Sequence, residues 1–444
     1  MRRPLKLPFA PDWLFTYTGV MLLTGILVNW GAGFTNFAHS LTLPSMELDL
    51  GISHTKAGLV ITVMAMVRMG STFIAGTLAP RYGSRFIIGI GTVGAGGAMI
   101  LIGFAQTYPL VLLASGLMGL GSGTALTPMM GLLSRWFRAE DRGLAAGLAA
   151  TGGSLAFIFA GVVVPWLVGR DADEGWRHAW FFFGTLAVLI GTVSLVFLRE
   201  RPKPGQGPEQ SAGQSTGREP AGQTSGAWPM AAYKNPMVWL IAFLAFTSGW
   251  SQNIFTSFFG VYLSQENGVS LTTAGQLVVL IGVLSVTSGV AWGRLSDRTS
   301  RGQAFFFSFL LQGVAYILMA VLPGMGSFII AAILLGLTLR ATYTICAASS
   351  GDYVAVQFSA AAFGVMSVGA GLGSAVSPTA GGAIADNLGM NWTFAVASVG
   401  SAVGMAGSLV MIKNPRSPER APQSAPTRIQ AARTPRAVPE GPHL

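Results

Sequence analysis

The sequence predicts an all-α membrane protein with twelve transmembrane helices in two six-helix halves. Three observations lead to this fold class: the chain is strongly apolar, it contains twelve long apolar runs, and its two halves repeat the same short motif. Of its 444 residues, 51% are hydrophobic and only 10% are charged, whereas ordinary soluble domains carry about 25% charged residues. Such a composition requires lipid as the solvent for most of the surface.

Each predicted span is a run of about 20 apolar residues, the length that an α-helix needs to cross the hydrocarbon core. The first six runs cover residues 14–41, 56–79, 86–105, 110–133, 143–168 and 178–197. The second six cover residues 237–263, 273–292, 303–322, 327–349, 361–384 and 392–412. The first run is too long for a signal-peptide core, so we expect it to remain as a span.

Basic residues are distributed unevenly between the two sides of these spans. With the N-terminus inside, only Lys56, Arg170 and Arg177 of the 27 Lys and Arg residues fall in segments on the outer side. By the positive-inside rule this asymmetry predicts a multi-pass protein of the inner membrane with both termini in the cytoplasm. It also accounts for the net charge of +10 without nucleic acid, because the basic residues form no aromatic-interleaved patch.

Composition divides the chain into four parts. Residues 1–197 and 236–412 form the two six-helix halves. Residues 198–235 join them and are rich in Gly, Pro, Gln and Ser, so we expect a disordered cytoplasmic linker. Residues 413–444 are basic and Pro-rich, and we expect a disordered cytoplasmic tail that lies on anionic lipid.

The two halves contain the same short motifs at corresponding positions. Span two ends in GTLAPRYGSR at residues 76–85, and span eight ends in GRLSDRTSR at residues 293–301. In spans one and seven, Trp30 precedes FTNF and Trp250 precedes FTSF. A duplicated six-span unit permits alternating access, because two similar halves can close over either end of a central site.

The second copy of the motif resembles the G-x-L-x-D-R-x-x-R signature of the major facilitator superfamily. The resemblance covers the chain except for the linker and the tail, and it implies a transporter whose cavity is lined by spans one, four, seven and ten. Within the superfamily the chain looks most like bacterial organic-anion carriers of the oxalate/formate and monocarboxylate type. Two positions depart from the family pattern: Pro80 replaces the motif Asp in the first half, and Ser115 replaces the usual Arg of span four.

The repeated motif is expected to gate the cytoplasmic side. Its glycine would allow a tight turn, its arginines would stay on the cytoplasmic face, and Asp297 would meet a neighbouring helix end or an arginine in one conformation. The alternative is that the motif is only a topology signal. The residues assigned to the motif are Gly293, Asp297, Arg298, Arg301, Gly76, Arg81, Gly83 and Arg85.

Arg68 and Arg340 fall near the middle of spans two and ten. Each costs about 2.5–3.5 kcal/mol at the bilayer centre, so each should face a cavity or a partner. All 17 Asp and Glu residues fall in loops, tails or span ends, which leaves no mid-membrane carboxylate to neutralise either arginine. We therefore expect Arg340 to bind the anionic group of a small organic substrate, with Arg68 as a second contact or gate. Structural pairing with backbone carbonyls or a carboxylate is the alternative.

Polar and aromatic residues of spans one and seven are expected to complete the substrate site, although any one of them could serve only as a contact between helices. Tyr343 joins them because it shares a helix face with Arg340. The predicted substrate-binding residues are Arg340, Arg68, Tyr343, Asn29, Trp30, Asn36, Trp250, Gln252 and Asn253.

Coupling is left open between proton symport and anion exchange, because the cavity lacks an obvious carboxylate. The candidates for a coupling residue are His39 in span one and Asp352 near the cytoplasmic end of span ten. We expect no cofactor and no metal, since the chain holds one cysteine and four scattered histidines. We expect a monomer whose partners are the anion, protons and the lipid bilayer.

Two other functions compete with anion transport. A drug or metabolite exporter would favour a roomy apolar pocket with a buried acid. A receptor that kept the fold would bind a ligand without moving it. An enzyme is not expected, because the sequence shows no nucleophile–base pair, no Walker loop and no HExxH motif.

Overall fold

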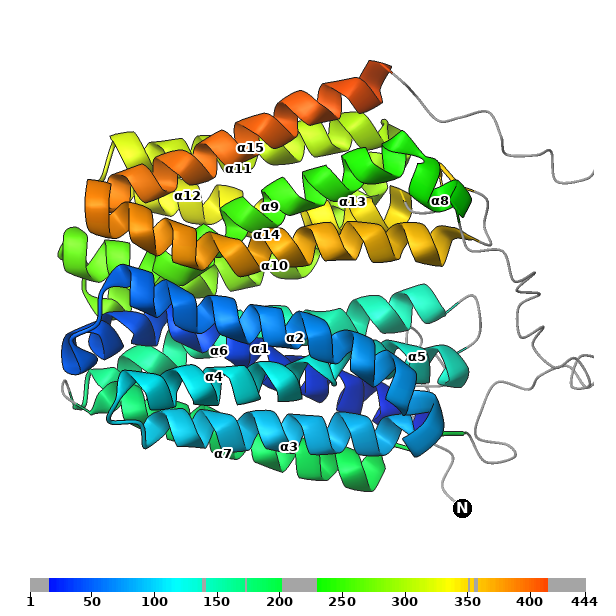
Figure 1. The fold of residues 1–444 in the computed structure, drawn as a ribbon, viewed down its shortest axis with the longest axis horizontal. Coiled ribbons are helices and arrows are strands. Elements are labelled where there is room, and N and C mark those ends of the chain that lie inside the picture. Colours follow the sequence, from blue (N-terminus) through cyan, green and yellow to red (C-terminus); the bar gives the residue numbers. More distant parts are fainter. Residues whose placement is uncertain are drawn as a thin grey trace, which may run out of the picture.

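The computed structural model describes residues 16–137, 141–171, 174–201, 230–349, 352–354 and 358–413. Within these ranges the chain is helical and contains no strand. Figure 1 shows two bundles of long helices lying side by side, the first half in blue to green and the second in green to orange-red. This arrangement agrees with two halves built from a duplicated unit.

The helices of each half follow the predicted spans. The first half consists of α1 (Tyr17–Leu50), α2 (His54–Tyr82), α3 (Ser84–Gly103), α4 (Tyr108–Gly123), α5 (Leu126–Trp136), α6 (Arg142–Val168) and α7 (Gly175–Phe197). The second half consists of α8 (Met230–Lys234), α9 (Pro236–Val261), the π-helix η2 (Tyr262–Glu266), α10 (Leu271–Arg298), α11 (Arg301–Val321), α12 (Met325–Thr338), α13 (Ala341–Ser349), α14 (Ser359–Leu388) and α15 (Met390–Lys413). Spans four and ten are each divided in two, as α4 with α5 and α12 with α13.

Eleven helical segments in the described part of the chain are long and apolar enough to cross a membrane. They correspond to the predicted spans one to six and eight to twelve. The predicted seventh span is α9, which has 26 residues and is long enough to cross. It is absent from the eleven because polar residues such as Thr247, Gln252 and Asn253 lower its mean hydropathy. The prediction of twelve spans therefore rests on α9.

Several helices are longer than the sequence predicts. Helix α1 continues through Pro44 to Leu50, because Leu43 and Met46 remain buried and extend the packed face. Helix α10 continues to Arg298, so the glycine of the second motif lies inside a helix. The expectation of a tight turn at Gly293 is wrong, and the same holds for Gly76 inside α2. Only Gly83 of the assigned glycines has a positive φ, of 92°.

The expected disorder of the linker is wrong at its C-terminal end. Residues 230–234 form α8, Ala232 is fully buried, and the Asn235 side chain donates a hydrogen bond to the Tyr353 carbonyl at 2.6 Å. Residues 202–229 and 414–444, which include most of the predicted linker and tail, lie outside the described residues.

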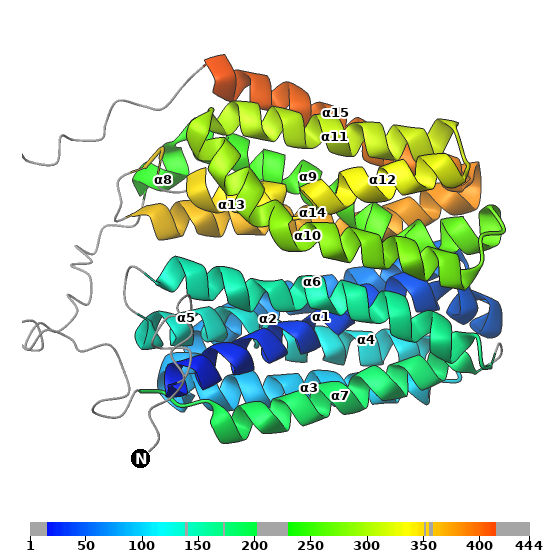
Figure 2. The same cartoon turned by 180° about the vertical axis from the view of Figure 1, so that it is seen from behind.

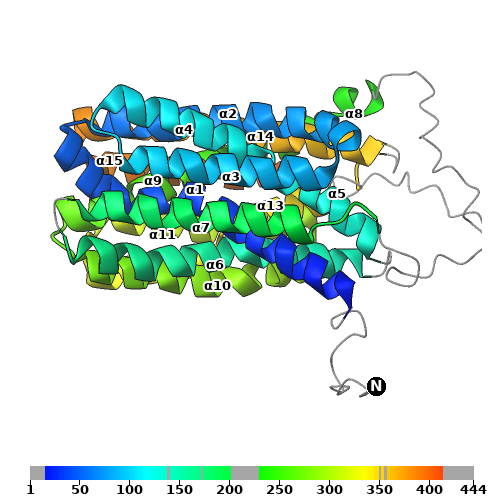
Figure 3. The same ribbon diagram turned by 90° about the horizontal axis from the view of Figure 1, so that it is seen from below.

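The two halves meet along a surface that we call the seam. Helix α2 packs against α14 on one side of the molecule and α6 packs against α10 on the other, while α1 meets α9 between them. Figure 2 shows α6 next to α10, and Figure 3 shows the α2 and α14 pair along the opposite side. The end of the molecule where α7 ends and α8 begins is called the linker end, and the opposite end is called the far end.

Hydrogen bonds across the seam begin at the far end. The Asp386 carboxylate accepts hydrogen bonds from the backbone N–H groups of His54 and Thr55 at 3.0 and 2.9 Å, so a side chain of the second half caps the N-terminus of α2. Gln265 donates to the Pro44 carbonyl at 3.0 Å. The far end is therefore tied shut by polar contacts between the halves.

Further cross-seam bonds lie nearer the middle of the helices. Thr62 donates to the Ala375 carbonyl at 2.6 Å, and Ser285 donates to Ser154 at 2.8 Å. Among the described residues, the bond nearest to the linker end runs from Arg340 to the carbonyl of Ala150. Arg340 thus lies where the hydrogen-bonded part of the seam ends.

Candidate functional site

Arg340 lies at a break in span ten. Helix α12 ends at Thr338 and α13 begins at Ala341, which leaves Leu339 and Arg340 in a turn between them. Tertiary contacts satisfy the backbone groups that the break frees, as helix ends require. The Arg340 N–H donates to the Ser288 hydroxyl at 3.1 Å, and the Trp292 indole N–H donates to the Leu337 carbonyl at 2.7 Å.

The Arg340 guanidinium crosses the seam and reaches α6 of the first half. Its Nη2 donates to the Ala150 carbonyl at 3.5 Å, a length at which a hydrogen bond is weak. No carboxylate of a described residue lies within ion-pair distance of this guanidinium. Since a guanidinium carries five N–H donors, Arg340 retains capacity for an anion.

Helix α6 has two glycines, and so no side chains, where Arg340 approaches it. A Cβ atom at Gly153 would lie 2.5 Å from Arg340 Nη2, so the guanidinium occupies space that any other residue would fill. On the neighbouring face, a Cβ at Gly152 would lie 2.8 Å from the Trp30 backbone nitrogen. The paired glycines let α1 and Arg340 approach the same stretch of α6 from different sides.

Arg68 lies on α2 at the contact with span four. Its carbonyl accepts hydrogen bonds from the Ser71 and Thr72 hydroxyls at 3.0 and 2.8 Å. Thr72 also donates to the Gly123 carbonyl at 3.1 Å, where α4 ends. Arg68 is partly buried. Because Thr72 in the next turn bonds to Gly123, Arg68 stands beside the break in span four, whereas Arg340 stands within the break in span ten.

Tyr343 follows Arg340 toward the linker end. Its side chain is 61% exposed, and its ring lies 6.0 Å from the ring of Phe363 on α14. The side chain therefore lies largely exposed, one turn away from Arg340.

The residues predicted in span one pack inside the first half. Asn29 donates to the Gly25 carbonyl of its own helix at 3.0 Å, and Trp30 packs edge-on against Phe34 and Phe159. Asn36 lies within α1, and its side chain is outside the described part of the structure. Asn29 and Trp30 therefore contact their own helix and α6.

The residues predicted in span seven behave similarly. Asn253 donates to the Gly249 carbonyl of its own helix at 3.2 Å, and Trp250 stacks on Phe246 at 6.4 Å. Gln252 is partly buried on the same helix. Arg340 instead contacts the Ala150 carbonyl of α6 and the Ser288 hydroxyl of α10, neither of which was predicted.

The two coupling candidates lie far apart. His39 is 1% exposed, its Nδ1 lies 3.1 Å from the Thr35 carbonyl, and its ring packs on Trp180 of α7 inside the first half. Asp352 lies at the linker end, where it accepts a hydrogen bond from Arg301 at 2.7 Å. The structure places neither of them beside Arg340.

The second copy of the repeated motif forms a compact ionic cluster at the linker end. Arg301 is only 8% exposed and pairs with Asp297 at 2.7 Å and with Asp352 at 2.7 Å. Asp297 is 66% exposed and lies four residues before its partner. Arg298 ends α10 next to this cluster.

The first copy of the motif is built differently. Glu200 after α7 accepts a hydrogen bond from the Arg85 N–H at 2.7 Å and lies 3.5 Å from Arg135. Arg81 belongs to the last turn of α2. Glu200 therefore caps the start of α3 at the place where the motif lacks its own carboxylate.

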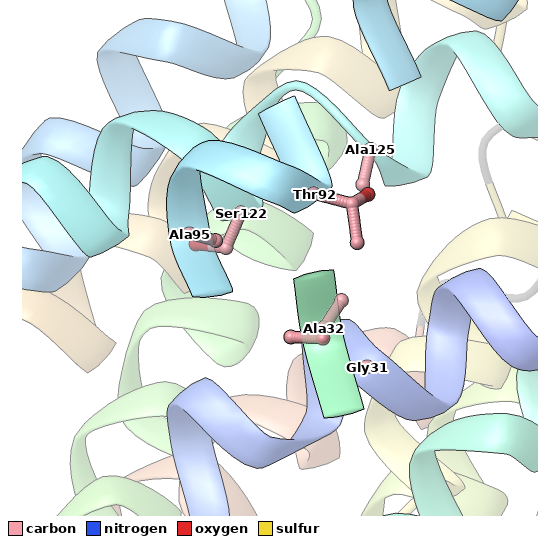
Figure 4. Close-up of a pocket in the computed structure, with 7 residues that line it drawn as sticks. Gly31, Ala32, Thr92, Ala95, Ser122 and Ala125 are labelled. Carbon is pink, nitrogen blue, oxygen red and sulfur yellow. The ribbon is translucent and has the colours of Figure 1, made fainter. Parts of the chain in front are cut away.

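Two pockets of the described structure lie away from Arg340. The pocket in Figure 4 lies inside the first half between Gly31, Ala32, Thr92, Ala95, Ser122 and Ala125, and its volume of about 10 Å³ suits one water molecule. A groove of about 450 Å³ between α2 and α4 is lined by apolar residues such as Val63, Leu113 and Leu117. Neither offers a charged group.

The residues around Arg340 could have been found from a weak signal. Ser285 and Ser288 are hydroxyl residues three apart in an apolar span, a spacing that puts both on one helix face. The adjacent Gly152 and Gly153 mark a position of close approach. Which helix approaches that position depends on how the halves pack, and a single sequence does not contain this information.

Comparison with known proteins identifies the family. The chain matches the sequence profile of the Major Facilitator Superfamily over residues 25–325 and 241–439, and it belongs to that superfamily. This confirms the membership that the repeated motif predicted.

The relatives and structural neighbours are distant. The chain is 23% identical over 361 residues to a probable sulfoacetate transporter of Cupriavidus necator, covering 79% of this chain and 83% of that protein. It is 25% identical to a membrane sensor protein of Escherichia coli, UhpC, over 61% of this chain and 62% of the sensor. A crystal structure of a bacterial homologue of the human lysosomal transporter Spinster superposes with a TM-score of 0.75 at 16% identity, covering 90% of this chain and 99% of that one. This last likeness concerns the fold.

Proposed function

We propose that this protein is a secondary active transporter that moves a small organic anion across the cytoplasmic membrane by alternating access. The observation that carries the proposal is the position of Arg340, a permanent cation at a helix break in the seam, with one weak hydrogen bond to a backbone carbonyl. A planar guanidinium binds a carboxylate or sulfonate through parallel hydrogen bonds. Arg340 is the anion ligand and Arg68 a second contact or gate.

The break in span ten supports this assignment electrostatically. Helix α13 begins directly after Arg340, and the N-terminus of a helix carries a partial positive charge that favours anions. Discontinuous membrane helices of other transporters direct half-helix N-termini at anionic substrates. The guanidinium and the start of α13 together form a positive region at mid-span depth.

The relatives support the same substrate class. One relative is described as a probable sulfoacetate transporter, and another as a probable hexose phosphate transport protein. Sulfonates, phosphates and carboxylates all present an anionic group of oxygen atoms to a guanidinium. We infer that the chain transports an anion of this kind rather than acting as an enzyme.

The orientation in the membrane follows from charge. Arg81, Arg85, Arg135, Arg298 and Arg301 all lie at the linker end of the described structure. By the positive-inside rule we assign this end, both termini and the linker to the cytoplasm of a twelve-span, monomeric inner-membrane protein. Because the hydrogen bonds across the seam lie between the far end and Arg340, we infer an inward-facing arrangement.

The test is uptake into proteoliposomes of labelled formate, acetate, oxalate, sulfoacetate and glucose 6-phosphate, driven by an imposed proton gradient or by an internal anion. We expect saturable uptake of at least one anion, lost in Arg340→Gln protein that remains folded. The driving condition distinguishes proton symport from exchange. Uptake that survives in Arg340→Gln would contradict the assignment, and no uptake of any anion would favour the exporter.

A sensor is the second candidate, because one relative is described as a membrane sensor protein. A sensor would bind an anion at Arg340 but would not accumulate it inside the vesicles. Binding without uptake in the same proteoliposomes would therefore decide for the sensor.

A further inference from the structure

The break in span ten is held open by three side chains of the neighbouring helices. Ser288 accepts the Arg340 N–H, Trp292 donates to the Leu337 carbonyl, and Gln312 of α11 donates to the Thr338 carbonyl at 3.4 Å. Ser288 is 1% exposed, Trp292 is 7% exposed and Gln312 is fully buried. Backbone groups that a continuous helix would pair internally are therefore paired with α10 and α11.

Ser288 has the most direct connection to Arg340. In an uninterrupted α-helix the N–H of Arg340 would donate to the carbonyl of Gly336, one turn earlier. The Ser288 hydroxyl supplies a competing acceptor at 3.1 Å. Since the direction of a side chain follows the backbone of its residue, this hydrogen bond helps to aim the guanidinium at Gly153 across the seam.

The same face of α10 links the break to the seam. Ser285 lies one turn before Ser288 and donates to Ser154 of α6 at 2.8 Å. Gly289 lies next to Ser288, and a Cβ at that position would be 3.5 Å from Arg340 Cβ. The residues of α10 therefore fix the height and direction of Arg340 relative to α6.

We propose that Ser288 is a positioning residue for anion binding: its hydroxyl holds the backbone of Arg340 in the broken conformation and so directs the guanidinium to the substrate. This inference rests on the proposed function of Arg340. Ser288 itself does not touch the anion. Its loss would leave a buried N–H without its acceptor, or would let span ten close into a continuous helix and turn Arg340 away.

The test is equilibrium binding of whichever labelled anion of the uptake panel binds most tightly, measured on purified full-length protein in detergent. Ser288→Ala is expected to raise Kd about tenfold, the scale of one lost hydrogen bond to a buried group. Ser288→Thr keeps the hydroxyl and is expected to recover most of the affinity. Ser349→Ala is the matched control, because Ser349 is a fully buried serine of α13 that donates only to the Ile345 carbonyl of its own helix.

The outcomes separate this inference from the proposed function. If Arg340→Gln abolishes binding while Ser288→Ala keeps the wild-type Kd, the positioning role is wrong and the anion site stands. If Arg340→Gln keeps the wild-type Kd, the proposed function fails and the inference fails with it. If Ser288→Ala does not fold, Trp292→Phe removes a second hydrogen bond of the break and is expected to raise Kd in the same direction. An unchanged Kd in Trp292→Phe would then overturn the inference.

Discussion

Each half places an arginine at the contact between its second and fourth helical spans, but a different helix supplies it. In the first half Arg68 belongs to α2, and in the second half Arg340 lies at the break in span ten. Gly119 of span four and Gly336 of span ten pack on Met64 and Ile281, which stand at the same position relative to the repeated motif. By this register Arg340 corresponds to Gly123 of the first half. Arg68 in turn corresponds to Ser285 of the second half.

The support of the two breaks is conserved between the halves while the charge is not. Ser71 and Ser288 occupy the same position before the motif, and each bonds to the backbone of the broken span. In the first half Gly123 of the broken span packs against Arg68 of α2, and in the second half Arg340 of the broken span bonds to Ser288 of α10. The comparison teaches that the duplicated fold sets the helix contact at which a cation can be held. The residues at that contact then decide which half supplies the cation that binds the anion.

The largest expected difference concerns anion affinity. Two charge-assisted hydrogen bonds of about 1.5–3 kcal/mol each are lost in Arg340→Gln, so Kd should rise by about 100-fold or more. Arg68→Gln should raise Kd by about tenfold, because we assign Arg68 as a secondary contact. Titration of labelled anion against the purified variants measures both. Equal losses in the two variants would break the proposed asymmetry between the halves.

The linker ends of the two halves should differ in stability. Arg301 and Asp352 are 8% and 7% exposed, so Asp352→Ala leaves a buried cation without this partner and should cost about 3–5 kcal/mol. Glu200→Gln in the first half should cost at most about 1 kcal/mol, because Arg135 and Glu200 are 52% and 37% exposed. Denaturant unfolding in detergent compares the two. A loss of similar size for both would show that the clusters are equivalent despite their different construction.

Asp297 sharpens the same comparison, since it is the motif residue that the first half lacks. Asp297 is 66% exposed, so Asp297→Asn should leave stability almost unchanged while slowing uptake. Initial uptake rates at matched protein insertion test this. An unaltered rate would leave the motif with a topological role only.

The far end should respond to a single carboxylate of the second half. Asp386→Ala removes the cap that ties α2 to α14 and should shift the equilibrium toward separation of the halves at this end by about tenfold or more. Spin labels at the exposed positions Leu48 and Leu388 report the separation, in a Cys346→Ser background because Cys346 is the only cysteine. Asn387→Ala is the matched control, since Asn387 bonds only within α14. Identical distance distributions for both variants would count against the cap.

The smallest expected effect on anion affinity comes from adding a methyl group to α6 at Gly153. Gly153→Ala would push the Arg340 guanidinium from its position and should raise Kd by about fivefold, within the cost of a disturbed hydrogen bond. Gly147→Ala on the same helix meets no atom within 4 Å and serves as control, with the same gain in helix propensity. If both variants bind the anion equally well, Arg340 does not act from this position.

The sequence was sufficient for the family, through the repeated motif, and for the approximate positions of the helices, because apolar run length is a local property. The role of Arg68 and Arg340 in anion binding stays a prediction. The sequence missed the breaks at Thr124–Ala125 and Leu339–Arg340; Pro128 follows the first of them by three residues, whereas no proline lies near the second. The broken spans also form hydrogen bonds with residues that are distant in sequence: Ser71 and Trp292 donate to them, and Ser288 accepts from the Arg340 N–H. Asn29 and Asn253 were expected to line the substrate site, which requires their side chains to point toward it. Both side chains instead donate hydrogen bonds to carbonyls of their own helices.

The most direct test of the central claim is a magnetic-resonance measurement of the contact between the substrate and Arg340 in proteoliposomes. A ¹³C-labelled anion from the uptake panel would be bound to protein with ¹⁵N-labelled guanidinium groups, and dipolar coupling would report a separation of about 4 Å or less. We predict that the coupling seen in the wild-type protein is reduced far more in Arg340→Lys than in Arg68→Lys. A coupling that persists unchanged in Arg340→Lys would contradict the account.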